Sequence, residues 1–240
     1  MQLSRNFTSC INWLFDNILP PILRDSKWFM TIWFKPLFGC KRHYFMQFKE
    51  VAPFLSKTEF KHYYHLLADK HITRATDLNV QSIKKIMETV AGESVLDVGC
   101  GRGYLAFQLV EQLGKIVTAI DMYIPETCLS SQNPRFIEGD IEKLPFDDNS
   151  FDTVLCTHTL EHAQNLEKAI SELRRVARKR VIVVVPRQRE YIYTFDLHIH
   201  FFPYISSLKK LMQREDALYQ VLGNDLFYCE EFMHFEEEFE

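Results

Sequence analysis

The sequence predicts an α/β fold, with a doubly wound, mostly parallel seven-stranded sheet that ends in an antiparallel C-terminal hairpin. Three observations support this prediction. From Thr76 onward, short β-branched segments alternate with amphipathic helical segments, as parallel strands joined by crossover helices require. The continuous apolar run "RVIVVVP" at 180–186 is typical of a strand buried on both faces. Residues 217–232 form two strand-like segments around a Gly-Asn turn, which predicts a hairpin.

The first elements follow from local patterns. Asp77 can cap a helix whose apolar positions recur at helical spacing. Those positions are Val80, Ile83, Met87 and Val90. Residues 95–98 then predict a short apolar strand, and residues 104–113 predict a helix closed by Gly114. Residues 116–120 predict a second β-branched strand.

The later elements repeat the alternation. Phe136 and Ile137 indicate a third strand, and "FDTVLC" at 151–156 indicates a fourth. A helix is expected from about Asn165. Its apolar face is Leu166, Ile170, Leu173 and Val176. Only residues 122–135 separate the second and third strands, and prolines at 125 and 134 limit any helix there.

Residues 1–75 differ from the rest in composition. They contain all three tryptophans, and repeated prolines break them into short predicted helices. We therefore expect an N-terminal helical, aromatic-rich extension at 1–75, a larger domain at 76–232 and an acidic tail at 233–240. The tail is expected to be a solvated end.

The extension is basic, with 11 Lys and Arg residues against 5 Asp and Glu, a net charge of +6. One interpretation is a helical lid whose aromatic residues form its core. A second is peripheral contact with a membrane surface through residues 1–50, because Trp13, Trp28, Trp33 and their basic neighbours suit an interface. Nucleic-acid binding is not expected, since the basic excess is modest and no RNA-recognition motif occurs.

The cysteine pattern and the hydropathy bear on the compartment. The six cysteines include no CxxC pair and no zinc-like spacing, so free thiols in a reducing, cytoplasmic compartment are expected. No segment approaches the roughly 18 apolar residues that would span a bilayer.

A glycine loop follows the first predicted strand in "SVLDVGCGRGYLAFQLVEQLG". Glycines at 99, 101 and 103 let the backbone turn tightly and approach a ligand closely. The discriminating residue is Asp97, two positions before the first glycine, where a phosphate-binding loop would disfavour a negative charge. A carboxylate there suits a ligand with an ammonium group.

Two further carboxylates follow the next strands. Asp121 ends the second strand, where a carboxylate can accept both hydroxyls of a ribose. Asp140 follows the third strand and can accept from an exocyclic amine such as that of adenine. Together with Asp97 they describe a nucleoside with an amino-acid tail and no phosphate.

Four motifs in order carry a family resemblance. "VLDVGCGRGYLA", "VTAIDM", "IEGDIEKLPFDDNSFDTVLCTHTLEH" and "RVIVVVP" resemble the class I S-adenosylmethionine-dependent methyltransferases, in particular the branch with the ubiquinone- and menaquinone-biosynthesis enzymes. The resemblance covers about residues 76–232 and implies a Rossmann-like sheet and S-adenosylmethionine as cofactor. It also implies that the last strand inserts antiparallel between its neighbours.

The resemblance also implies the cofactor-binding residues. Asp97, Gly99 and Gly101 would line the methionine moiety, Asp121 would hold the ribose and Met122 would pack on the adenine. The remaining implied cofactor-binding positions are Cys100 in the glycine loop, Asp140 and Ile141 at the adenine edge and Thr157 beside the cofactor.

Candidate general bases lie in "CTHTLEH" after the fourth strand. His158 and His162 follow that strand at the mouth of the predicted site, but they can equally cap or pack the next helix. Glu161 is better explained as a first-turn carboxylate favoured by the helix dipole than as an acid catalyst.

Residues 189–203 follow the fifth strand and bring Tyr191, Tyr193, His198 and His200 to the same rim. The histidine pair could suggest a metal, but with no third ligand evident no metal site is expected. The segment is expected to shape an acceptor pocket, with its two phenylalanines at 201 and 202 as anchors.

These residues bear on three classes of function. The sequence favours a methyltransferase that uses S-adenosylmethionine on a small-molecule or lipid-like acceptor. The alternative is a catalytically inactive scaffold or regulatory subunit that keeps the fold and the cofactor. A nicotinamide-dependent dehydrogenase fits poorly, because Asp97 would have no role in it.

Overall fold

The computed structural model describes residues 13–15, 17–67 and 75–232. These residues form two compact units. The first combines Met1–Asp77 with Arg187–Pro203, and the second combines Leu78–Pro186 with Tyr204–Glu240, each as far as it is described. The acidic tail predicted at 233–240 lies outside the described residues.

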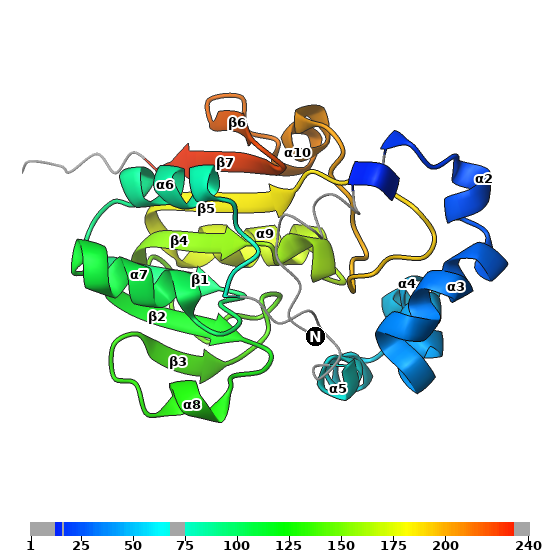
Figure 1. Cartoon of the computed structure of the whole chain (residues 1–240). Coiled ribbons are helices and arrows are strands. Elements are labelled where there is room, and N and C mark those ends of the chain that lie inside the picture. The colour runs from blue at the N-terminus through cyan, green and yellow to red at the C-terminus, as the bar shows by residue number, and fades with distance from the viewer. Residues whose placement is uncertain (1–12, 16, 68–74, 233–240) are drawn as a thin grey trace, which may run out of the picture. The chain divides into compact units, whose positions relative to one another are not determined.

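The second unit is built on one seven-stranded sheet (Figure 1). Its strands are β1 (Ser94–Val98), β2 (Ile116–Asp121), β3 (Arg135–Glu138), β4 (Phe151–Thr157), β5 (Ala177–Pro186), β6 (Leu218–Leu222) and β7 (Asp225–Glu231). Their spatial order is β3-β2-β1-β4-β5-β7-β6. Strands β1 to β5 pair in parallel, whereas β7 runs antiparallel between β5 and β6. The predicted sheet and the inserted last strand are confirmed.

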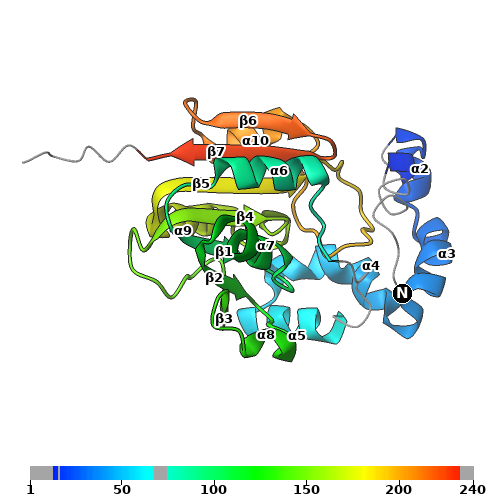
Figure 2. The same cartoon turned by 60° about the vertical axis from the view of Figure 1, so that its left-hand side comes forward.

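Helices cover both faces of the sheet. α6 (Val80–Thr89) and α7 (Tyr104–Leu113) lie on one face, and α9 (Leu166–Val176) and α10 (Ile205–Met212) lie on the other (Figures 1 and 2). β5 lies between β4 and β7, and its residues 181–185 are fully buried. The apolar run therefore occupies the middle of a sheet that is covered on both sides, as predicted.

The start of α6 differs from the prediction. Asn79, not Asp77, is the capping residue, and its side chain accepts a hydrogen bond from the Ser82 N–H at 2.8 Å. Val80, predicted on the apolar face, is 81% exposed, whereas Ile86 is fully buried. The other three predicted positions, Ile83, Met87 and Val90, are partly buried and pack against the core.

The structure contains two helices that the sequence patterns do not predict as elements. A four-residue helix, α8 (Glu126–Leu129), fits between the prolines of the β2–β3 connection and begins just after Pro125. Pro125 is compatible with it because the residue before a helix needs no backbone N–H. α10 was not predicted, although Leu208 and Met212 form a buried stripe at helical spacing.

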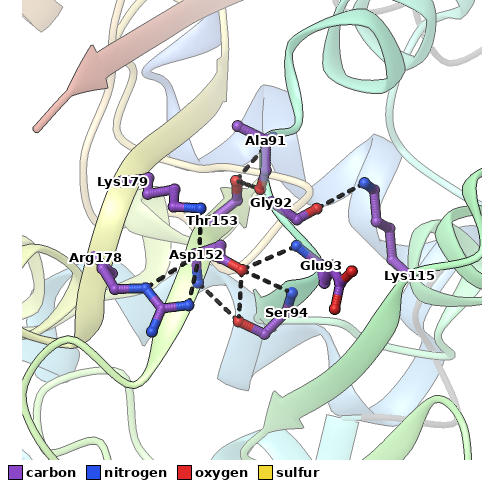
Figure 3. Close-up of polar contacts among 9 residues, drawn as sticks. All are labelled: Ala91, Gly92, Glu93, Ser94, Lys115, Asp152, Thr153, Arg178 and Lys179. Atoms are coloured by element: carbon purple, nitrogen blue, oxygen red, sulfur yellow. Dashed lines mark hydrogen bonds and ion pairs between the residues drawn. The ribbon is translucent and has the colours of Figure 1, made fainter.

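A buried carboxylate connects the amino-terminal ends of the central strands (Figure 3). Asp152 of β4 is 3% exposed and accepts hydrogen bonds from the backbone N–H groups of Glu93 at 2.9 Å and Ser94 at 3.2 Å. Arg178 and Lys179 of β5 form ion pairs with it at 2.7 and 3.1 Å. Although burial alone would raise the pKa of Asp152, these donors hold it below its ordinary value. The network ties the amino-terminal ends of β1, β4 and β5 together.

The first unit is helical, as predicted for the N-terminal extension. Its helices are α2 (Pro21–Arg24), α3 (Lys27–Phe38), α4 (Arg42–Val51) and α5 (Lys57–Leu67), with 3₁₀ turns η1 (Gly39–Lys41) and η2 (Ala52–Phe54). Phenylalanines form its core: Phe15 and Phe34 are fully buried, and both contact the Phe195 ring, with centroids 5.2 and 5.0 Å apart. The predicted aromatic core therefore consists mainly of phenylalanine.

The tryptophans of the first unit are outside that core. Trp13, Trp28 and Trp33 are 55%, 66% and 40% exposed. Within the described residues, no helix combines the length and the apolar character needed to cross a bilayer. All five cysteines among the described residues of the whole chain are free thiols.

Candidate cofactor site

The loop after β1 is fastened to the end of β2. The backbone N–H groups of Gly99 and Cys100 both donate to the carbonyl oxygen of Ile120, at 2.8 and 3.2 Å. The Gly103 N–H donates to the Cys100 carbonyl at 2.8 Å, which closes a tight turn directly before α7. The loop and the end of β2 therefore form one rigid piece of backbone.

The glycines of this loop are required for different reasons. A Cβ on Gly99 would lie 1.9 Å from Thr159 Oγ1, and one on Gly103 would lie 2.4 Å from the Phe136 ring. Protein atoms therefore exclude a side chain at both positions. At Gly101, φ is +53°, and apart from its two chain neighbours no atom of the described residues lies within 4 Å of the place a Cβ would take. The bare backbone at Gly101 faces open space that a ligand can enter.

Asp97 is a buried carboxylate with an unsatisfied oxygen. The residue is 1% exposed, and its Oδ1 has no hydrogen-bond partner among the described residues. Burial, and then the negative charge of Asp121, raises the pKa of Asp97 to about 7. A buried polar atom without a partner costs about 1–3 kcal/mol, so this oxygen is suited to receive a donor from a ligand.

Asp121 ends β2 and is held by the glycine loop. Its Oδ2 accepts a hydrogen bond from the Gly101 N–H at 2.8 Å, and its Oδ1 accepts one from the Tyr123 N–H at 3.3 Å. Burial raises the pKa of Asp121, although these N–H donors partly oppose the shift. Asp97 and Asp121 are close enough for the charge of one to raise the pKa of the other. The structure thus brings these two predicted residues together, with half-buried Met122 directly after them.

The third predicted carboxylate lies beyond the next strand. Asp121 pairs with Glu138 at the end of β3, and Asp140 follows two residues later. Asp140 Oδ1 accepts a hydrogen bond from the Glu142 N–H at 3.0 Å, which stabilises the turn, and Ile141 is 8% exposed. The structure places Asp140 at the carboxyl end of the strand next to β2, but its contact with a cofactor stays a prediction.

The end of β4 contributes Thr157 and His158. Thr157 is 9% exposed and pairs with Val184 of β5. His158 has a left-handed backbone with φ of +50°, which is uncommon for a residue other than glycine. Its Nε2 lies 3.1 Å from Asp225 Oδ1, within hydrogen-bond distance. This contact ties the end of β4 to the start of β7.

Asp225 is a residue that the sequence analysis missed. It is 1% exposed and also accepts hydrogen bonds from Ser82 Oγ and Asn79 Nδ2, both at 2.7 Å. Burial alone would raise its pKa, but these contacts, foremost His158, lower it. The only sequence signal was an aspartate directly after a Gly-Asn turn, which is ordinary turn chemistry and does not reveal burial.

Glu161 and His162 lie in the 3₁₀ turn η4 (Leu160–His162) after β4. Glu161 is fully buried, and its Oε1 lies 3.9 Å from His158 Nδ1. His158 is therefore flanked by two carboxylates, a geometry that favours a structural role. A role for His158 or His162 as general base stays a prediction.

Four predicted rim residues, Tyr191, Tyr193, His198 and His200, belong to the first unit. There, Gln188 Nε2 donates to the Tyr191 hydroxyl at 2.9 Å, and Gln188 Oε1 lies 2.8 Å from His198 Nδ1. Gln188 therefore joins Tyr191 and His198 in one network of polar contacts. The expected absence of a metal stays a prediction.

The second unit contains a segment that matches a known protein family. Residues 96–185 match the family described as "Methyltransferase domain". A sterol 24-C-methyltransferase of Gibberella zeae is 40% identical over 95 residues, which are 35% of this chain and 25% of that protein. The malonyl-[acyl-carrier protein] O-methyltransferase of Buchnera aphidicola is 36% identical over 102 residues, 41% of this chain and 40% of that protein. The chain thus spans well under two thirds of the length of these relatives.

A solved structure supports the fold over a larger part of the chain. A chain in the complex between the Haloferax volcanii Trm112 methyltransferase activator and a methyltransferase has a TM-score of 0.52 with 16% identity. The match covers 76% of this chain and 96% of that one. At this identity the likeness concerns the fold alone.

Proposed function

We propose that this chain, which belongs to the class I S-adenosylmethionine-dependent methyltransferases, transfers a methyl group from S-adenosylmethionine to a small-molecule or lipid-like acceptor. The observation that carries the proposal is the unsatisfied, buried Oδ1 of Asp97 near the open backbone at Gly101. A carboxylate at this place suits an ammonium group, whereas the pyrophosphate of a dinucleotide would be repelled.

The residues present fit the cofactor. In the proposal, Asp97 receives the ammonium group, the backbone at Gly99, Cys100 and Gly101 lies along the methionine moiety, and Asp121 accepts from the ribose hydroxyls. The other positions are Met122 on the adenine face, Asp140 and Ile141 at the adenine edge, and Thr157 beside the cofactor. Asp121 is already oriented by the Gly101 N–H, so part of its geometry is fixed in advance.

Methyl transfer from S-adenosylmethionine needs few catalytic side chains. When bound, S-adenosylmethionine supplies a methyl group that is already activated on a sulfonium. The chain therefore has to hold the two reactants in line and exclude water, and such positioning can supply about 7–11 kcal/mol of the barrier. A general base is needed only if the acceptor carries a proton at the working pH. The engagement of His158 with Asp225 is thus compatible with activity.

The class of acceptor rests on the relatives. The names of two of them specify a sterol, which is a lipid, and a malonyl group on an acyl carrier protein. A third, the demethylmenaquinone methyltransferase of Tropheryma whipplei, is 29% identical over 154 residues, 59% of this chain and 62% of that protein. We therefore favour an apolar acceptor. A cytoplasmic location, with membrane contact through residues 1–50, belongs to the same proposal.

Calorimetry tests the donor. The chain is expected to bind S-adenosylmethionine and not NADH, and Asp97→Asn is expected to weaken the binding. Glu93→Gln is a matched control, because Glu93 is an exposed carboxylate at the opposite edge of the sheet. Failure of the unmodified chain to bind S-adenosylmethionine would end the proposal.

A second experiment separates an enzyme from an inactive scaffold. The chain is incubated with S-adenosylmethionine and a lipid extract, and S-adenosylhomocysteine is measured by mass spectrometry. Product above that of the Asp97→Asn variant supports an enzyme. Binding without turnover on lipid and polar extracts alike would favour the scaffold.

A further inference from the structure

The outer face of α3 is apolar although it points away from the core of its own unit. Met30, Phe34 and Phe38 recur at every fourth position of this helix and are buried. About half a helical turn away from this stripe, Trp28 and Ile32 are 66% and 60% exposed. These two residues define the outer face of α3.

The chain just before α3 adds further exposed apolar side chains. Trp13, Ile18 and Ile22 are 55%, 58% and 81% exposed. A single exposed isoleucine is ordinary, but a concentration of large apolar side chains in one short stretch marks an interaction surface. The exposed apolar side chains at positions 13–32 therefore indicate that this stretch, including the outer face of α3, binds a partner.

The charges on α3 indicate what that partner is. The helix carries Lys27 and Lys35 and no acidic residue. Lys35 follows Ile32 by three positions and Trp28 by seven, so it lies on the same side of the helix. An exposed apolar face with a lysine beside it is complementary to a bilayer that carries anionic headgroups.

The tryptophans are also suited to a lipid boundary. An indole ring combines a large apolar surface with one polar N–H, and it prefers the zone between headgroups and acyl chains. All three tryptophans of the chain lie within residues 13–33, and all three are exposed. With 12 residues, α3 is far shorter than the roughly 20 that span a bilayer, so it would lie in the plane of the surface.

We infer that the outer face of α3 binds the surface of a bilayer that contains anionic lipid. Trp28 and Ile32 enter the boundary with the acyl chains, and Lys35 lies beside the headgroup phosphates. Vesicle binding needs neither cofactor nor turnover, so this inference can fail or succeed independently of methyl transfer.

Vesicle flotation and tryptophan emission test it on the full chain. Vesicles of phosphatidylcholine mixed with phosphatidylglycerol are expected to carry the chain and to shift its emission to shorter wavelength. Because every tryptophan lies in this one stretch, the emission reports on it alone. The double variant Trp28→Ser with Ile32→Ser should bind at least about tenfold more weakly, and Lys35→Gln about fivefold more weakly.

A matched control removes equally exposed apolar side chains elsewhere. Val80→Ser with Ile116→Ser changes residues of the second unit that are 81% and 64% exposed, and it should bind as the unmodified chain does. Equal thermal unfolding of all variants would show that they fold. The inference is overturned by absence of flotation, by equal loss in the control, or by concentration-dependent dimers that the Trp28→Ser and Ile32→Ser changes abolish without any vesicle binding. Equal binding to vesicles of pure phosphatidylcholine would refute the requirement for anionic lipid.

Discussion

Replacing Asp97 by asparagine should stabilise the protein that lacks its cofactor, and the gain should grow with pH. The pKa of Asp97 is raised from 3.8 to about 7, so between these values the folded state holds a proton that the unfolded state has released. Stability is therefore lost as the pH rises through this window. Since one pKa unit corresponds to about 1.4 kcal/mol, the full cost of ionising Asp97 is about 4 kcal/mol.

The size of the expected effect follows from the same two pKa values. At about pH 5 the unmodified chain has incurred less than half of that cost, and at about pH 8 nearly all of it. The Asp97→Asn variant carries no charge here at any pH. The difference in unfolding free energy between the variant and the unmodified chain should therefore increase by about 3 kcal/mol from pH 5 to pH 8. An unsatisfied amide in the variant adds a constant that cancels in this comparison.

Urea denaturation of both proteins at the two pH values, without cofactor, measures this difference. Asp152→Asn is the matched control: the pKa of Asp152 is lowered, so its titration lies below this range and its difference should stay flat. If the difference for Asp97→Asn also stays constant within about 0.5 kcal/mol, Asp97 is not a buried carboxylate with a raised pKa, and the site reasoning fails. Calorimetry should show that the stabilised variant has lost affinity for S-adenosylmethionine.

Four further predictions concern the loop and its supports. Gly101→Ala should fold, with a cost of about 1–2 kcal/mol for its left-handed backbone, but should not bind S-adenosylmethionine in calorimetry; retained affinity would contradict an open approach at this residue. Gly99→Ala, whose Cβ would lie 1.9 Å from a neighbouring side chain, should lose clearly more stability in urea than Gly101→Ala, and equal losses would refute the crowding. Asp152→Asn should lower the unfolding free energy at neutral pH by about 2 kcal/mol or more, because its ion pairs are lost; a loss under about 0.5 kcal/mol would show that the network is dispensable. His158→Ala should cost about 1–3 kcal/mol, because Asp225 loses a donor, and His158→Gln should restore part of it; a loss of turnover with unchanged stability would instead indicate a general base.

The parallel sheet could be predicted because its signal is local and repeated. Each of β1, β2, β4 and β5 is a β-branched run next to a helix with a regular apolar stripe, and the order of the elements leaves few topologies. Helix boundaries were less secure. Asp77 and Asn79 are both capping residues by type, and only the hydrogen bond from Ser82 to Asn79 decides between them. Propensity alone contains no such information.

In the candidate site, too, some residues could be predicted from local sequence and others could not. Asp97 and Asp121 were predictable, because a carboxylate inside an apolar strand and one at the next strand end stand out against their neighbours. Asp225 was not, because its burial depends on contacts with residues 67 to 146 positions away in the sequence. The role of Thr159 could not be predicted for the same reason. Its side chain lies against Gly99 only because β4 pairs with β1 in the folded sheet.

The carboxylate proposed to hold the ammonium group is unfavourable to folding, and the rest of the second unit offsets it. Without ligand, the unpartnered, buried oxygen of Asp97 raises the energy of the folded chain. The Asp152 network and the fully buried residues 181–185 of β5 supply stability elsewhere in the sheet. Because the loop is fastened to Ile120, it cannot relax by moving away from Asp97 without breaking two backbone hydrogen bonds. The charge therefore stays where it is, and a cation from outside the protein is the group that can satisfy it.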